Sequence, residues 1–210
     1  MTIMDRMRIG LAVFSCALGI VVGAGAGSAA DQTGLAKATF AGGCFWCMEE
    51  VFEQVEGVVS VLSGYMGGTL ANPSYEQVSA GDTGHAESVE VLYDPAKVSY
   101  SKLLEAFWRN VDPITPNAQF CDHGSQYRSA IFYLDEEQKR LAEESKQTIE
   151  GAKRFKQPIV TQIVRASQFY PAEDYHQDFY KKNPIRYKFY KYTCGRAQRL
   201  EDLWGTSTKG

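Results

Sequence analysis

The chain has 210 residues, of which 44% are hydrophobic and 22% are charged, and its formal net charge is −3. That length is enough for one domain with a substantial hydrophobic core. The near balance of charges gives no reason to expect nucleic acid or a membrane surface as a partner.

The N-terminal segment is typical of a secretory signal peptide. Arg6 and Arg8 precede an apolar run at 9–22, and small residues typical of a cleavage site follow it. The apolar run is short for a segment that spans a bilayer. We therefore expect 1–30 to be a cleavable signal peptide and 31–210 to be a single exported domain, periplasmic or secreted. We expect that domain to be a monomer without stable membrane association.

A glycine pair links a predicted strand at 37–40 to a predicted helix. After the pair, apolar residues recur at helical spacing and acidic residues occupy the other face. The apolar residues are Met48, Val51, Phe52 and Val55, and the acidic residues are Glu49, Glu50, Glu53 and Glu56. Cys44 therefore lies at or just before the helix start, where free N–H groups and the helix dipole favour a thiolate. A buried cysteine in a tight turn is the alternative interpretation.

The rest of the chain predicts strands and helices in irregular alternation. Further strands are predicted at 58–65, 87–93, 127–134 and 158–165. Helices are predicted after Ser74, from Ser99 or Ser101 to Asp112, from Asp135 to about Gly151, and from Pro171 to 183–184. A polar loop covers 115–125, and a tyrosine-rich tail covers 187–210. This order predicts a two-layer α+β domain with its C-terminal segment wrapped over it.

Four cysteines lie outside the predicted signal peptide, at Cys44, Cys47, Cys121 and Cys194. The first two form a C-x-x-C motif, whose spacing supports reversible disulfide chemistry or supplies half of a zinc site. His123 or the later cysteines would complete such a zinc site. In an exported protein, structural disulfides are also expected. These residues alone leave two classes open: a thiol-disulfide oxidoreductase, and a non-enzymatic binding domain stabilised by zinc or disulfides.

Four segments in order carry a resemblance to a known family. They read Gly-Cys-Phe-Trp at 43–46, Gly-Asp-Thr-Gly-His-Ala-Glu at 81–87, Asp-His-Gly-Ser-Gln-Tyr-Arg-Ser at 122–129 and Ala-Glu-Asp-Tyr-His-Gln at 172–177. With them the chain resembles the A-type peptide methionine sulfoxide reductases. The resemblance implies a plait-like α/β fold with a ferredoxin-like core, and thiol-dependent reduction of methionine S-sulfoxide, free or in proteins, as repair of oxidative damage. It implies a thioredoxin-like dithiol reductant and neither a metal nor an organic cofactor.

Reduction of a sulfoxide requires a soft nucleophile at sulfur and an acid that is still protonated near neutral pH. The resemblance assigns the attack to Cys44 and the proton to Glu87. Burial among apolar side chains would raise the pKa of such a carboxyl group. Without the resemblance, Glu87 reads as an exposed carboxylate at a strand edge.

The resemblance also implies roles for five neighbours of these two groups. Tyr75 and Tyr127 would donate hydrogen bonds to the sulfoxide oxygen as negative charge develops on it. Phe45 and Trp46 would form an apolar wall for the S-methyl group. Asp122 would tune the ionisation of Cys44. Taken alone, each residue has a simpler reading, as a core aromatic, a surface tyrosine or a turn residue.

Attack leaves a sulfenic acid on Cys44, and a second thiol condenses with it to give a disulfide. The family keeps resolving cysteines in its C-terminal segment, so Cys194 is the first choice. Family members usually have glycine where Cys47 stands, and many have another cysteine after the position of Cys194, where this chain has none. Cys47 and Cys121 therefore remain alternatives, as resolving thiols or relays. Cys47 lies one helical turn from Cys44, so a local disulfide is sterically allowed.

Overall fold

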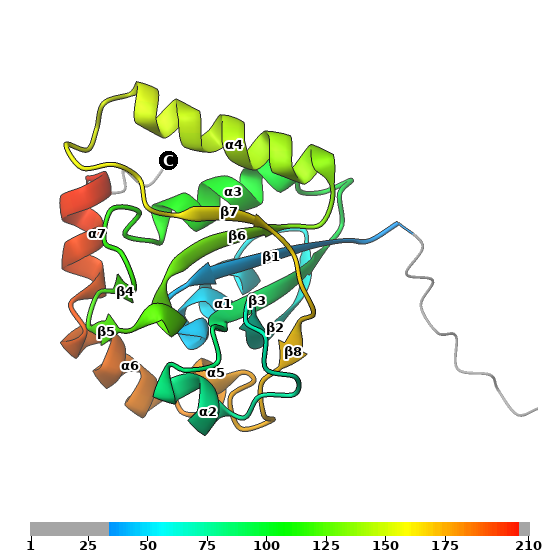
Figure 1. The fold of residues 1–210 in the computed structure, drawn as a ribbon, viewed down its shortest axis with the longest axis vertical. Coiled ribbons are helices and arrows are strands. Elements are labelled where there is room, and N and C mark those ends of the chain that lie inside the picture. Colours follow the sequence, from blue (N-terminus) through cyan, green and yellow to red (C-terminus); the bar gives the residue numbers. More distant parts are fainter. Residues whose placement is uncertain (1–33, 206–210) are drawn as a thin grey trace, which may run out of the picture. The chain divides into compact units, whose positions relative to one another are not determined.

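The computed structural model describes residues 34–205, so the predicted signal peptide lies outside the described residues. Within them a six-stranded sheet has the order β7-β6-β1-β3-β2-β8 (Figure 1). Its strands are β1 (Ala36–Gly42), β2 (Val58–Met66), β3 (Ala86–Tyr93), β6 (Ser129–Tyr133), β7 (Gln162–Arg165) and β8 (Tyr170–Pro171). Neighbouring strands are antiparallel except β6 and β7, which are parallel. The predicted strands are therefore present, and β1 and β3 lie at the centre of the sheet.

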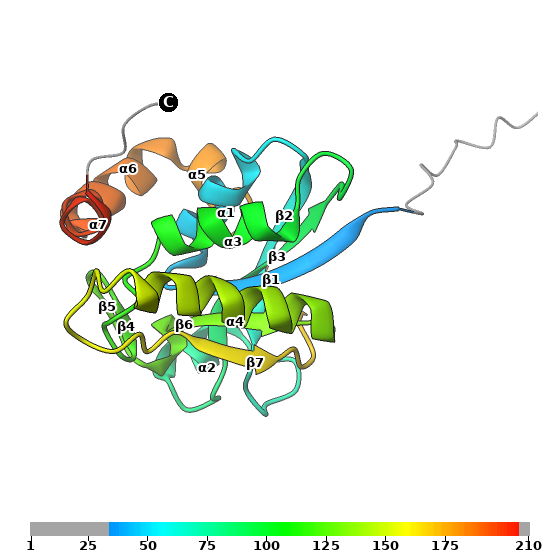
Figure 2. The ribbon, with the colours of Figure 1, turned by 90° about the horizontal axis from the view of Figure 1, so that it is seen from above.

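Seven α-helices accompany this sheet in the described residues. They are α1 (Phe45–Glu53), α2 (Tyr75–Ala80), α3 (Tyr100–Arg109), α4 (Glu136–Gly151), α5 (Phe179–Lys182), α6 (Pro184–Thr193) and α7 (Arg196–Trp204). α1 and α3 pack on the sheet, and α4 packs beside α3 over β6 and β7 (Figure 2). The main core between them includes Phe40, Met48, Phe52 and Phe107, all at most 1% exposed. The predicted α+β class is confirmed, because helices and a mostly antiparallel sheet form two layers around one core.

Three of the predicted helix starts have the capping hydrogen bonds that their sequences indicate. Ser74 Oγ accepts from the third backbone N–H of α2 at 3.4 Å, and Ser99 Oγ accepts the equivalent bond in α3 at 3.2 Å. Asp135 accepts at 2.8 Å in α4. Each cap satisfies an N–H group that has no partner inside its own helix. No helix in the described part of the chain is both long and apolar enough to cross a bilayer.

The predicted polar loop at 115–125 has more structure than expected. It contains a small hairpin of β4 (Ala118–Gln119) and β5 (Asp122–His123), followed by a 3-10 turn at Ser125–Tyr127. Strands of two residues are too short to show an alternating pattern, so no periodic signal predicts them. The hairpin fixes the positions of two predicted functional residues, Asp122 within it and Tyr127 just after it.

The C-terminal segment, which the sequence predicts to wrap over the domain, is helical and packs on α1. Pro184 is the first residue of α6, where proline is favoured because its missing N–H would have no helical partner. The Asn-Pro pair at 183–184 therefore ends α5 and also begins α6. The helix predicted after Pro171 is reduced to the four residues of α5.

The acidic face of α1 is covered by α5 and α6. Lys191 in α6 forms an ion pair with Glu50, and the Asp178 N–H donates to Glu49 Oε1 at 3.0 Å. Glu49 is only 1% exposed, and burial raises its pKa to about 7. The polar face of this helix is therefore the surface against which the C-terminal segment packs.

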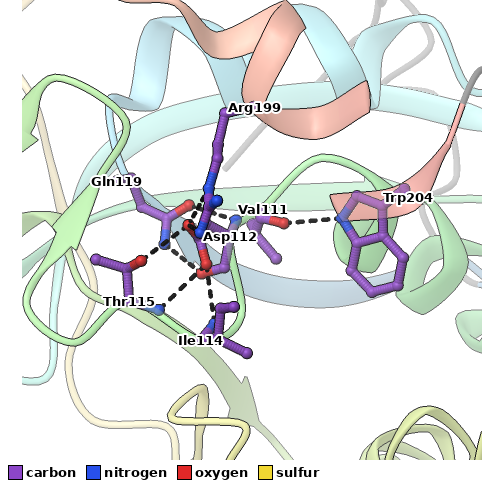
Figure 3. Close-up of polar contacts among 7 residues, drawn as sticks. All are labelled: Val111, Asp112, Ile114, Thr115, Gln119, Arg199 and Trp204. Atoms are coloured by element: carbon purple, nitrogen blue, oxygen red, sulfur yellow. Dashed lines mark hydrogen bonds and ion pairs between the residues drawn. The ribbon is translucent and has the colours of Figure 1, made fainter. Parts of the chain in front are cut away.

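A buried carboxylate joins α7 to the loop that follows α3 (Figure 3). Asp112 is 2% exposed, and its Oδ2 accepts from Arg199 and from the Thr115 hydroxyl, both at 2.8 Å. Its Oδ1 accepts from the N–H groups of Ile114 and Thr115. Gln119 in β4 bonds the backbone N–H and carbonyl of the same aspartate at 2.8 and 2.7 Å. The cluster therefore fixes the hairpin and α7 to the core.

We expect Asp112→Ala to lower the free energy of unfolding by about 2 kcal/mol, since it removes several hydrogen bonds to a buried charged acceptor. The contribution of Arg199 is reduced by solvent, because its side chain is 40% exposed. Urea denaturation measures the change. Glu105→Ala, which breaks an exposed ion pair with Lys102, is the control and should cost less than about 0.5 kcal/mol. Equal losses in the two variants would contradict this role for Asp112.

A candidate active site around Cys44

Cys44 stands where the sequence predicts it, at the turn between β1 and α1. It is the N-cap residue of α1, and its carbonyl accepts the N–H of Cys47 at 3.1 Å. Gly43 has φ +80°, and a Cβ atom there would lie 2.5 Å from the Cβ of Gln119. Only glycine fits this close approach of the turn to the β4 strand. The turn directs the Cys44 side chain toward the hairpin and away from solvent.

A cavity of about 70 Å³ lies beside this sulfur. Its lining is Cys44, Phe45, Trp46, Tyr75, Glu87, Asp122, Tyr127 and Tyr190. The structure thus brings together every residue that the sequence predicts as catalytic or substrate-binding, although these residues come from distant segments. Their individual roles stay predictions. Tyr190 is an addition, since the sequence placed it only within a tyrosine-rich tail.

Glu87 is held beneath the helix start. It lies on β3, a central strand, so the alternative of an exposed strand edge is wrong. Its side chain is 3% exposed, and Oε2 accepts the N–H of Phe45 at 3.0 Å. Burial raises the pKa of Glu87 to about 8, although the Phe45 N–H opposes this shift. The carboxyl group is therefore protonated at neutral pH and available as an acid.

The two tyrosines that the resemblance names as hydrogen-bond donors both line this cavity. Tyr75 is the first residue of α2, and its N–H donates to Glu173 Oε1 at 2.9 Å. Glu173 also accepts from the Tyr65 hydroxyl at 2.9 Å, so α2 is tied to the sheet. Tyr127 reaches the cavity from the turn after the hairpin. Burial raises the pKa of both lining tyrosines, which keeps their hydroxyl groups protonated as donors.

The apolar wall is braced from outside the cavity. Trp46 stacks on Phe179 with ring centroids 3.7 Å apart, and its Nε1–H donates to Nδ1 of His176 at 3.1 Å. Burial lowers the pKa of His176, so the ring is neutral and Nδ1 is free to accept. His176 therefore positions Trp46.

Asp122 is hydrogen-bonded to Tyr190, the lining residue that the sequence did not single out. The Tyr190 hydroxyl donates to Asp122 Oδ2 at 2.5 Å, which joins α6 to β5 at the cavity. Burial raises the pKa of Asp122, and the bond from Tyr190 opposes that shift. No motif or spacing marks Tyr190 among its neighbouring tyrosines. Its role depends on where α6 packs, and a single sequence does not reveal that.

The four cysteines form two pairs. Cys44 and Cys47 are free thiols, 6% and 2% exposed. Cys121 and Cys194 form a disulfide with their Cα atoms 4.9 Å apart. Cys194, the first choice for resolving the sulfenic acid, is therefore bonded in this structure to another cysteine of the hairpin. Two sulfurs bonded to each other do not act as thiolate ligands, so the zinc site completed by Cys121 or Cys194 has no support here.

The free pair shares a proton. Burial, followed by the hydrogen bond with Cys47, raises the pKa of the Cys44 thiol, contrary to the expectation from the helix start alone. The hydrogen bond from Cys44 and the charge of Arg196 lower the pKa of Cys47 to about 6, against the effect of burial. The pair therefore loses its first proton near neutral pH. Transfer of the remaining proton from Cys44 to Cys47 would place the negative charge on Cys44.

Arg196 is the second functional residue that the sequence did not indicate. It is 3% exposed, donates to the Asn110 carbonyl at 2.5 Å and lies 4.4 Å above the Phe120 ring. A buried guanidinium is costly unless anions are near. The charge of Arg196 favours the ionised forms of Cys47, Asp122 and Glu50.

Comparison with known sequences places the chain in one family. Residues 36–208 match the family described as Peptide methionine sulfoxide reductase. A peptide methionine sulfoxide reductase MsrA of Streptococcus uberis is 55% identical over 168 residues, which cover 80% of this chain and 98% of the relative. The MsrA of Listeria monocytogenes serotype 4b is 50% identical over 170 residues, which cover 81% of this chain and 96% of the relative.

Comparison with solved structures agrees. Mxr1 from Saccharomyces cerevisiae in its reduced form has a TM-score of 0.69 and 32% sequence identity, and the match covers 74% of this chain and 89% of Mxr1. A buried thiol beside a protonated carboxyl group suits the thiol-dependent reduction of methionine sulfoxide. The chain therefore belongs to the A-type peptide methionine sulfoxide reductases and is an oxidoreductase of that activity.

Proposed function

We propose that this enzyme reduces the S epimer of methionine sulfoxide, free or in oxidised proteins, with Cys44 as the attacking sulfur and Glu87 as the proton donor. One observation carries the proposal. Cys44 and a carboxyl group whose pKa is raised to about 8 line the same small cavity, and Cys47 does not line it.

The first step transfers the sulfoxide oxygen to the enzyme. The Cys44 thiolate attacks the sulfoxide sulfur while Glu87 gives its proton to the oxygen, and the hydroxyls of Tyr75 and Tyr127 stabilise the charge on that oxygen. The S–O bond of the substrate then breaks and the oxygen passes to the Cys44 sulfur. Methionine leaves, and Cys44 becomes a sulfenic acid, so the substrate gains the two electrons that the cysteine loses. Phe45 and Trp46 exclude water and contact the S-methyl group.

The second step forms a disulfide inside the protein. Cys44 and Cys47 lie in one buried cluster, one helical turn apart, and the pKa of Cys47 is lowered to about 6. Attack of the Cys47 thiolate on the sulfenic acid forms the Cys44–Cys47 bond, and the sulfenic oxygen takes up a proton and leaves as water. Geometry thus favours Cys47 over Cys194 as the first resolving thiol.

The third step involves both cysteine pairs, which we call the inner pair (Cys44 and Cys47) and the outer pair (Cys121 and Cys194). It reduces the inner pair and oxidises the outer pair. The Cys121 and Cys194 thiols exchange with the Cys44–Cys47 disulfide and become a disulfide themselves, while the inner sulfurs return to thiols. The structure has thiols at Cys44 and Cys47 and a disulfide between Cys121 and Cys194, the pairing expected after that exchange, which supports the proposal. A thioredoxin-like dithiol then reduces the outer disulfide. The solved complex of Mxr1 with Trx2 supports a reductant of this class.

Turnover of the two methionine sulfoxide epimers with dithiothreitol tests the proposed function. We expect the S epimer to be consumed at least about 100-fold faster than the R epimer, because only one places its oxygen toward Glu87 and its methyl group toward Trp46. Methionine formation is followed by chromatography. Equal rates for both epimers, or no reaction with either, would contradict the proposal.

Export and a role in oxidative stress complete the proposal. Support comes from the sequence, in which Arg6 and Arg8 precede an apolar run and a small-residue cleavage site. Expression of the full chain in a bacterium, followed by N-terminal sequencing of the periplasmic protein, is expected to give a mature start at Asp31. A full-length protein that stays in the cytoplasm would count against export.

A further inference from the structure

One face of α6 is apolar and uncovered. Ile185, Phe189 and Tyr192 are 86%, 70% and 86% exposed, which makes them the most exposed large apolar side chains among residues 34–205. They lie at positions i, i+4 and i+7, so they share one side of the helix. We call these three residues the α6 face. A contiguous apolar patch of this kind marks an interaction site more often than scattered exposed residues do.

The opposite side of the same helix holds α6 on the protein. Tyr187 is 3% exposed there, and its hydroxyl donates to Glu50 of α1 at 2.7 Å. The α6 face is therefore not needed to attach the helix. Two exposed cations, Arg186 and Lys188, lie on the flanks of the α6 face. A partner that fits has an apolar centre with acidic groups at its rim.

The α6 face leads directly to the outer disulfide. Tyr192 is the last residue of the α6 face, and Cys194 caps the C-terminus of the same helix. Cys121 is exposed, whereas Cys44 and Cys47 are 6% and 2% exposed. A protein dithiol therefore has access to the outer disulfide and not to the inner pair. When the reductant reaches this disulfide, the surface around the reductant's own dithiol must lie against the residues next to Cys194.

We propose that the α6 face is the docking surface for the thioredoxin-like reductant, an inference that rests on the reductant proposed above. A thiolate of the bound reductant attacks the sulfur of the exposed residue Cys121, the Cys121–Cys194 bond breaks, and Cys194 leaves as a thiolate that takes up a proton. The second thiol of the reductant then attacks the mixed disulfide. Cys121 returns to a thiol, and the reductant leaves with its own disulfide.

The size of the α6 face suits a brief encounter. Transient redox complexes bury little surface, less than about 1,200 Å² in total. Three side chains on a helix of ten residues form a small contact surface, as a transient complex requires. The cations at the flanks accelerate encounter with an acidic partner without making the complex long-lived.

The double variant Ile185→Gln/Phe189→Gln tests the docking surface, since glutamine keeps helix propensity while it removes the apolar contacts. The oxidised protein is mixed with reduced thioredoxin, and reduction of the Cys121–Cys194 disulfide is followed by stopped flow. We expect the second-order rate constant to fall about tenfold or more, as loss of central apolar contacts predicts. The rate of reduction by dithiothreitol, which needs no docking surface, is expected to stay unchanged.

Val59→Gln/Leu134→Gln is the matched control, because these apolar side chains are 56% and 42% exposed in other parts of the protein. It should leave both rate constants unchanged. Equal rate constants for thioredoxin in the α6 variant and the wild type would overturn the inference, as would a wild type that thioredoxin does not reduce. Flotation of the wild type with anionic lipid vesicles, together with an unchanged thioredoxin rate, would reassign the α6 face to a membrane surface. None of these measurements needs sulfoxide turnover, so failure of the proposed function is seen separately with dithiothreitol and the S epimer.

Discussion

Replacement of Glu87 by glutamine is expected to slow release of the first methionine by about 100-fold or more, the usual contribution of a positioned general acid. Glutamine has nearly the same shape, and its carbonyl oxygen still accepts the Phe45 N–H, so the cavity keeps its form. A rapid-quench assay of reduced enzyme with an excess of the S epimer measures this step without interference from later disulfide exchange. Circular dichroism and the melting temperature should stay close to those of the wild type.

The pH profile separates proton donation from a merely structural role of Glu87. The raised pKa of about 8 means that the wild-type carboxyl is protonated below that pH and deprotonated above it. The single-turnover rate should therefore fall about tenfold per pH unit above pH 8. It should also fall below about pH 6, where the shared thiolate of the Cys44–Cys47 pair is protonated. Glu87→Gln should lose the upper limb and keep the lower one.

Glu90→Gln is the matched control for this variant. Glu90 lies on the same strand, is half-buried and pairs with Lys37 at 2.9 Å, outside the cavity. It should keep the wild-type rate and both limbs of the pH profile. An unchanged single-turnover rate in Glu87→Gln would refute Glu87 as the proton donor.

We expect the Cys47→Ser variant to release one methionine per chain and then to turn over about 100-fold more slowly with thioredoxin. The reason is that the sulfenic acid on Cys44 loses its neighbouring thiol. Cys44 is 6% exposed, so a protein reductant does not reach that sulfenic acid directly. Methionine counted per chain, with and without thioredoxin, gives both numbers.

Cys194→Ser provides the comparison. A fully reduced wild type holds two dithiols and should release about two methionines per chain without added reductant, whereas Cys194→Ser should release about one, because only the inner pair then supplies electrons. If Cys47→Ser instead turned over at the wild-type rate with thioredoxin, the resolving role would return to Cys194, the choice that the sequence favours.

The sequence predicts those parts of the site that depend on local patterns. The glycine pair and the helical spacing after it place Cys44 at the N-cap of α1. Alternation along β3 places Glu87 on the same side as Val89 and Val91, which face the core. The resemblance to the family then names residues from distant segments, and the fold brings them to one cavity.

The parts of the site that the sequence does not predict depend on how the helices pack against one another. Periodicity shows that Glu49 and Glu50 share a face of α1, but it does not show that α5 and α6 cover that face. Only this packing places Tyr190 against Asp122 and Arg196 near the Cys44–Cys47 pair. The same packing leaves the α6 face free.

Identification of the sulfur that becomes a sulfenic acid tests the proposed mechanism most directly. Reduced Cys47→Ser protein, in which that acid should accumulate, is mixed with methionine S-sulfoxide and dimedone, a reagent specific for sulfenic acids, and the adduct is located by mass spectrometry. We predict one adduct per chain, on Cys44, formed together with one methionine. An adduct on Cys121 or Cys194, or methionine formed while Cys44 stays unlabelled as a free thiol, would contradict Cys44 as the attacking sulfur.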